Sequence, residues 1–99
     1  MLTDSIVRVD RASIDSILAA TFGGERKYMN YAVGSRIERI ITDAEENHDH
    51  EFFGVHARFN EICEVLRVSF GTEHSESHRI ACEILRTLGV DHMIDPECV

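Results

Sequence analysis

Residues 52–70 read FFGVHARFNEICEVLRVSF, and this stretch decides the fold. Its large apolar residues recur at steps of three or four, which keeps them on one face of an α-helix. They are Phe52, Val55, Phe59, Ile62, Leu66 and Phe70. The pattern predicts a helix over residues 51–69, with Asp49 as its N-cap and Gly71 at its end.

Two further helices are predicted before this stretch. Asp10 is a good N-cap for a helix over residues 11–22, and Gly23 stops that helix. Residues 25–47 predict a longer helix, in which Gly34 marks a close approach to another helix. Its apolar stripe consists of Met29, Val33, Ile37, Ile40, Ile41 and Ala44.

The helix over residues 25–47 is long for so small a chain. At ~1.5 Å per residue it spans ~34 Å. A chain of 99 residues has an expected diameter of only ~26 Å. We therefore expect the helix to project from the domain and to support a homodimer through residues 25–47.

A fourth helix is predicted over residues 73–88. Either Thr72 or Ser75 caps its start, and Gly89 ends it. Its buried stripe consists of Ala81, Ile84, Leu85 and Leu88. Residues 90–99 then form a tail that docks in part, through Val90, Met93 and Ile94.

The predicted fold class is therefore all-α, a single domain over residues 1–99 built from four helices. An α+β fold, with a short strand over residues 5–10, is the alternative. The composition, 43% hydrophobic and 28% charged, is typical of a globular domain.

Cysteine usage and hydropathy predict a soluble, cytoplasmic protein. The three cysteines form no paired spacing, which argues against a disulfide framework. Cys63 and Cys82 fall on apolar stripes, whereas Cys98 is in the tail. No apolar run approaches 18 residues and no secretory signal is evident, so we expect no contact with a membrane.

The net charge of −8 is concentrated in the second half of the chain. Residues 43–99 hold thirteen acidic and four basic residues, a net charge of −9. Such a segment repels phosphate backbones and attracts basic surfaces, so we expect a protein partner and no direct binding to nucleic acid. Residues 43–51, DAEENHDHE, hold five acids and no Lys or Arg. The predicted partner-binding residues are Asp43, Glu45, Glu46, Asp49 and Glu51.

These features predict a protein-binding module that regulates or inhibits its partner by occupying a basic, nucleic-acid-binding surface. The closest analogy is with the small acidic helical proteins that phages direct against host enzymes, and it rests on fold and charge alone. We expect no catalytic activity, no cofactor and no metal. A basic side of helix 25–47, formed by Arg26, Lys27, Arg36 and Arg39 beside two tyrosines, is interpreted as a solvated face.

Two alternatives involve a metal. His74, His78 and Cys82 share one face of the fourth helix and could hold zinc. Separately, Glu45-Glu46-Asn-His-Asp49 and Glu61-Ile-Cys-Glu64 loosely resemble the two carboxylate motifs of the all-α, MazG-type nucleotide pyrophosphatases. The resemblance covers about twenty residues, and each motif departs from the family pattern at its last acid. It implies a magnesium-dependent enzyme acting on nucleotides.

Overall fold

The computed structural model describes residues 9–46 and 52–94, with the backbone alone at 52–56 and 92. The helices are α1 (Arg11–Phe22), α2 (Lys27–Glu46), α3 (Phe52–Phe70) and α4 (His74–Leu88), followed by the 3-10 turn η2 (Asp91–Met93). The described residues contain no strand, so the all-α prediction is confirmed. Most of the strand predicted over residues 5–10 lies outside the described residues.

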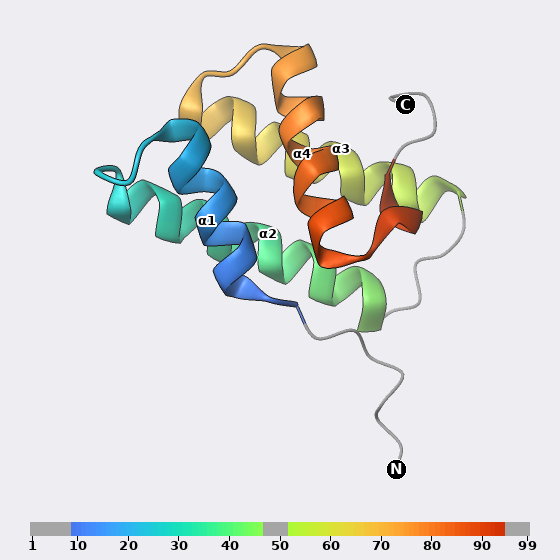
Figure 1. The fold of residues 1–99 in the computed structure, drawn as a ribbon. Coiled ribbons are helices and arrows are strands. Elements are labelled where there is room, and N and C mark those ends of the chain that lie inside the picture. Colours follow the sequence, from blue (N-terminus) through green and yellow to red (C-terminus); the bar gives the residue numbers. More distant parts are fainter. Residues whose placement is uncertain (1–8, 47–51, 95–99) are drawn as a thin grey trace.

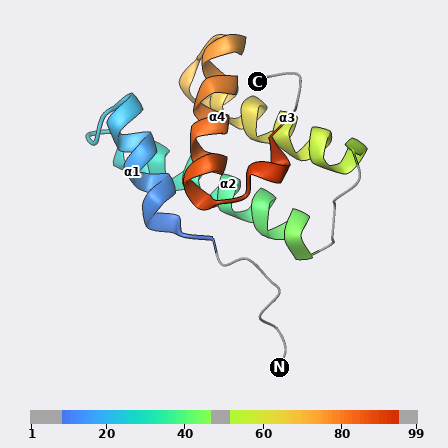
Figure 2. The ribbon, with the colours of Figure 1, turned by 45° about the vertical axis from the view of Figure 1, so that its right-hand side comes forward.

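The four helices form two layers. α2 and α3 run antiparallel, side by side, and α1 and α4 cross one face of this pair (Figures 1 and 2). The molecule measures 40 × 30 × 18 Å, and its shortest dimension matches two layers of helices that are each ~10 Å thick. No helix in the described part of the chain has both the length and the apolar character to cross a bilayer.

The core fills the space between the layers, and every helix contributes to it. Phe59, the largest fully buried residue, lies on α3. The tail prediction holds for Val90, Met93 and Ile94, which are buried. Cys63 and Cys82 are also buried, as their positions on apolar stripes predict. The other fully buried large residues are Ile14, Leu18, Val33, Ile37, Ile41, Ile62, Leu66, Ile80, Ile84 and Leu85.

The apolar pattern misplaced one residue of α2. Met29 belongs to the predicted stripe, yet it is 41% exposed. It lies in the first turn of α2, where the helix extends past the cover provided by its neighbours. Its exposed side chain lines a groove between α2 and α3.

Helix ends agree with the sequence in four cases. Gly71 ends α3, with a φ of 70°. The Ala12 amide donates to the Asp10 carboxylate, with an N–O distance of 3.1 Å, which caps α1. Gly23 ends α1, with a φ of 102°. Gly89 ends α4 in the left-handed region, with a φ of 77°, where glycine is favoured.

The prediction that Thr72 or Ser75 caps α4 is wrong. The N-cap is Glu73, whose side chain makes no capping hydrogen bond. Inside the first turn, the hydroxyl of the buried Ser77 donates to the His74 carbonyl at 2.9 Å. The predicted cap of α3, Asp49, lies outside the described residues.

The reason given for a projecting α2 is also wrong. The helix has 20 residues and is therefore ~30 Å long, which fits within the longest dimension of 40 Å. The radius of gyration, 13.0 Å, is that of an ordinary compact domain of this length. A homodimer through α2 stays a prediction and needs a different basis.

α1 approaches α2 closely at Gly34, as the sequence predicts. A Cβ placed on Gly34 would lie 2.8 Å from Asp15 Oδ1 and 2.9 Å from Arg11 Nε. Arg11 occupies this position and donates to Asp15 Oδ1 at 3.0 Å and Glu38 Oε1 at 3.2 Å. It also donates to the carbonyl of Tyr31 at 2.7 Å. One side chain of α1 thus fills the space left by a missing side chain on α2.

The charge on Arg11 is maintained by these partners. Partial burial acts to lower the pKa of Arg11, but the hydrogen bonds and negative charges of Asp15 and Glu38 outweigh it and raise the pKa above its ordinary value. The guanidinium also lies 4.8 Å from the centre of the Tyr31 ring, within reach of a cation–π interaction. Arg11 therefore stays cationic and links α1 to α2 at any physiological pH.

Replacing Arg11 with Ala should destabilise the domain. The Arg11→Ala variant loses two ion pairs, a hydrogen bond to a backbone carbonyl and packing against Tyr31, so we expect a loss of about 1–2 kcal/mol in the free energy of unfolding. Urea denaturation measures this loss. The control is Arg39→Ala, an exposed arginine on α2, which should change stability by less than about 0.5 kcal/mol. Equal effects of the two substitutions would contradict the role given to Arg11.

Gly34→Ala should have an effect that depends on Arg11. In the native background, the gain in helix propensity of about 1 kcal/mol is offset because the new methyl group displaces Arg11 and Asp15. In the Arg11→Ala background most of that obstacle is gone, so Gly34→Ala should stabilise the domain. A double-mutant cycle measures the coupling, which should be about 1 kcal/mol. Strict additivity of the two substitutions would show that Gly34 is not constrained by Arg11.

Candidate functional site

The predicted acidic site begins at the C-terminal end of α2. Asp43, Glu45 and Glu46 all lie in the last turn, which contains no basic residue. This end of a helix carries the negative pole of its macrodipole, so carboxylates there are placed unfavourably. Asp49 and Glu51 follow in sequence and lie outside the described residues.

The three described carboxylates differ in their surroundings. Asp43 and Glu45 are half-buried, and each takes part in an interaction of the chain's own. The expectation that the chain leaves this whole cluster without internal partners is therefore wrong for these two residues. Glu46 is exposed to solvent. The acidic end thus presents Glu46 most directly to a partner.

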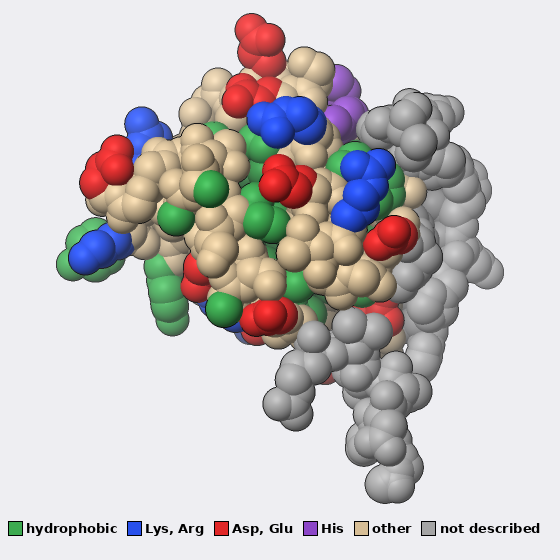
Figure 3. Space-filling model, viewed as in Figure 1, with side chains coloured by type: hydrophobic (Ala, Val, Ile, Leu, Met, Phe, Trp, Pro, Cys, Tyr) green, Lys and Arg blue, Asp and Glu red, His purple; other side chains and the backbone are tan. Residues whose placement is uncertain are grey.

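Charge is not gathered into one patch on the face that α1 and α4 form. Figure 3 shows acidic and basic side chains interspersed over this face. Exposed pairs on the helices contribute to this pattern, including Arg79–Glu83 at 4.0 Å. Such pairs contribute little to stability and leave both members able to exchange partners.

The predicted zinc ligands do not form a three-residue site. The rings of His74 and His78 lie edge to face, with centroids 4.1 Å apart, and His78 also contacts the Phe59 ring at 5.3 Å. Cys82 is buried in the core. Within residues 9–46 and 52–94, no three His, Cys, Asp or Glu side chains are grouped so that they could hold a metal ion.

The same finding bears on the carboxylates that resemble the MazG-type motifs. Glu45, Glu46, Glu61 and Glu64 are described, and they take part in no group of three side chains that could hold a metal ion. Asp49, the last acid of the first motif, lies outside the described residues.

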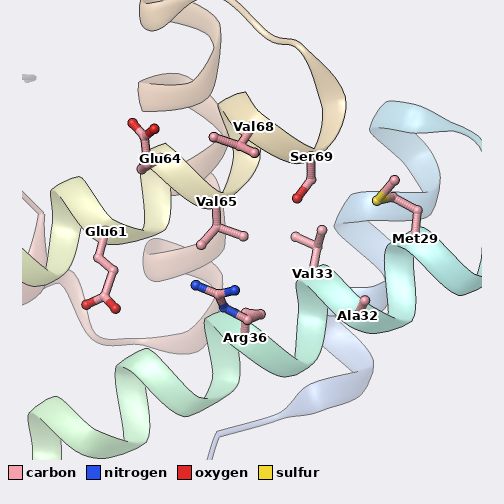
Figure 4. Close-up of a pocket in the computed structure, with 9 residues that line it drawn as sticks. All are labelled: Met29, Ala32, Val33, Arg36, Glu61, Glu64, Val65, Val68 and Ser69. Carbon is pink, nitrogen blue, oxygen red and sulfur yellow. The ribbon is translucent and has the colours of Figure 1, made fainter.

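A groove between α2 and α3 is the best-defined concave surface of the described chain. Its volume is about 350 Å³, and Figure 4 shows its side chains coming from both helices. Val33 and Val65, both buried, form its floor, and the exposed side chains of Met29 and Val68 lie at its rim. The remaining lining residues are Ala32, Arg36, Glu61, Glu64 and Ser69.

The two walls of the groove carry opposite charge. Arg36 projects from α2, and Glu61 and Glu64 from α3 (Figure 4). Both glutamates have partners on their own helix: Glu61 pairs with the half-buried Arg58 at 3.7 Å, and Glu64 pairs with the exposed Arg67 at 2.6 Å. Arg36 has no ion pair with any carboxylate of the described ranges.

Two exposed large hydrophobic residues of the described chain, Met29 and Val68, line this groove, and Val68 is 73% exposed. Tyr28 and Tyr31, in the first half of α2, are 92% and 68% exposed, and Tyr31 lies on the α1 side of the helix, under Arg11. Sequence periodicity missed the groove because Val68 lies off the apolar stripe of α3. This position could have indicated the groove from the sequence alone. A valine that lies off the buried stripe cannot pack in the core, and it is therefore a candidate contact residue.

Comparison with known proteins adds no functional information. No protein-family model, no curated protein and no solved structure matches the chain.

Proposed function

We propose that the chain is an acidic protein-binding module that regulates a partner by occupying a basic surface, such as one that binds nucleic acid. The residues proposed to contact the partner are Asp43, Glu45, Glu46, Asp49 and Glu51. The proposal includes no catalytic step and no direct binding to nucleic acid.

One observation carries the proposal. Asp43, Glu45 and Glu46 occupy the last turn of α2, which contains no basic residue, and Glu46 is exposed to solvent. Two more acids follow within five residues. Carboxylates gathered in this way create a negative field that attracts the cations of a basic surface.

The net charge supports the same conclusion. At −8 over 99 residues, the chain has a field that attracts basic surfaces and accelerates their encounter with it. Because that attraction acts through exposed charges, salt should screen it, with a Debye length of ~8 Å at physiological ionic strength.

The metal-dependent alternatives are not put forward as second functions. The described carboxylates of the two pyrophosphatase-like segments take part in no group of three side chains that could hold a metal ion. The rings of His74 and His78 are in contact, but Cys82 lies inside the core, and the three side chains do not form a group that could hold a metal ion.

Neutralising the acidic cluster should weaken binding without unfolding the domain. The test variant carries Asp43→Asn, Glu45→Gln, Glu46→Gln, Asp49→Asn and Glu51→Gln. Its control carries Glu25→Gln, Glu73→Gln, Glu76→Gln, Glu83→Gln and Asp91→Asn, which removes the same number of charges from other parts of the surface.

The measurement uses the immobilised chain and a host lysate at low and high salt, followed by affinity titration of the purified captured protein. The test variant should bind that protein at least ~10-fold more weakly at low salt, since up to five ion pairs with the partner, at ~0.3–1 kcal/mol each, are lost. The control should bind within about threefold of the native chain. If the two variants lost the same affinity, the loss would be due to net charge alone, and the acidic cluster would be rejected as the binding site. Binding that does not depend on salt would also contradict the proposal.

A further inference from the structure

The α2–α3 groove is the surface that the proposed acidic function leaves unused. It lies on α2 and α3, is apolar at its floor, and has exposed Met29 and Val68 at its rim. α2 and α3 are covered by α1 and α4 on one face (Figures 1 and 2). Two antiparallel helices with one uncovered apolar seam form half of a four-helix bundle, and a second such pair completes it.

We propose that the groove is a homodimer interface, in which the α2–α3 pair of one copy packs face to face on the α2–α3 pair of a second copy. This goes beyond the acidic binding function and does not depend on it.

The charges on the two walls of the groove favour a second copy as the occupant. On the α2 wall, Val33 lies beside Ser69 and Arg36 lies beside Val65 (Figure 4). Glu61 lies beyond Arg36, toward the C-terminal end of α2 (Figure 4). Arg36 is the charged residue of the α2 wall, and Glu61 and Glu64 are the charged residues of the α3 wall.

A twofold axis parallel to the two helices makes this surface complementary to itself. The rotation places α2 of one copy over α3 of the other, with each level kept at the same height. Arg36 of each copy then faces the α3 wall of the other, which carries Glu61 and Glu64. Because the contact is isologous, the favourable charge contact forms twice.

A twofold axis perpendicular to the helices lacks this property. It places α2 over α2 and α3 over α3 and reverses the heights along them, so that Arg36 of one copy does not face the acidic wall of the other. The positive and negative walls therefore select one of the two face-to-face arrangements, in the way that charged rims set the register of other interfaces.

The charges involved are available for exchange. Arg36 forms no ion pair within the described ranges. The partner of Glu64, Arg67, is exposed, and the partner of Glu61, Arg58, is half-buried. Glu61 and Glu64 are themselves exposed, and pairs of this kind on one helix are weak. A second copy can therefore supply a further cation to this wall.

The available area is that of a weak but specific dimer. α2 is ~30 Å long and two adjacent helices are ~20 Å wide, so the face offers ~600 Å² per copy, or ~1,200 Å² in total. A specific interface needs roughly 1,000 Å². We expect a dissociation constant in the micromolar range, since this area is at the low end of those found for specific interfaces.

The first experiment uses analytical ultracentrifugation to measure the molar mass of the protein in solution at protein concentrations from about 5 to 500 μM. The native chain should convert from monomer to dimer over this range. Val68→Asp should raise the dissociation constant at least ~10-fold, because it places a charge at the apolar rim. Val68 is 73% exposed, so this change should leave the fold intact, which circular dichroism checks. The control Ala12→Asp, at an exposed position of α1, should leave the dimer unchanged.

The second experiment tests the wall-to-wall pairing by charge exchange. Arg36→Glu alone and Glu61→Arg with Glu64→Arg should each abolish the homodimer, because like charges meet in both contacts. An equimolar mixture of the two variants should form a heterodimer, in which each contact again joins opposite charges. Arg79→Glu on α4 serves as the control and should dimerise like the native chain.

Three outcomes would overturn the proposal. One is a native chain that stays monomeric throughout the concentration range. Another is a dimer that Val68→Asp and Arg36→Glu leave unchanged, which would place the interface on another face. A third is charge-reversed variants that fail to associate when mixed, which would exclude the twofold arrangement described above. None of these results bears on the acidic cluster at the end of α2, so the two proposals can fail separately.

Discussion

A pair of antiparallel helices has two faces, and in this domain α1 and α4 both lie on the same one. That constraint governs the rest of the structure. The core forms between the two layers, where residues such as Ile37, Phe59 and Ile84 are completely buried. Among residues 9–46 and 52–94, no further helix covers the outer face of α2 and α3. The groove lies on that face because the two other described helices pack on the opposite one.

The placement of α1 on α2 depends on a fit between one missing and one large side chain. Gly34 allows α1 to approach, and Arg11 fills the space and binds three groups around it. Glycine inside a helix costs about 1 kcal/mol relative to alanine. The ion pairs of Arg11 with Asp15 and Glu38 compensate for part of that cost. The space above Gly34 and the ion pairs of Arg11 therefore both determine how α1 packs on α2.

The two proposed contact surfaces both include residues of α2. The last turn of α2 holds three carboxylates at the negative pole of the helix, and the opposite half of α2 leaves Met29 and two tyrosines in contact with water. Both are consistent with surfaces that are completed by another molecule, one through charge and the other through apolar contact. The two lie at different ends of the same helix, so one rigid element presents both.

The sequence by itself determined the helices, because their periodicity and their glycine stops are local properties of the chain. The three-four spacing of α3, the cap at Asp10 and the ends at Gly23 and Gly89 needed no knowledge of distant residues. It also identified Gly34 as a contact point and Val90, Met93 and Ile94 as docking residues. Only the tertiary structure decided which apolar residues stay exposed, since burial depends on what packs against a helix and not on the helix itself. Met29 and Val68 are apolar residues, and they lie at the rim of a groove because α1 and α4 cover the other face of α2 and α3.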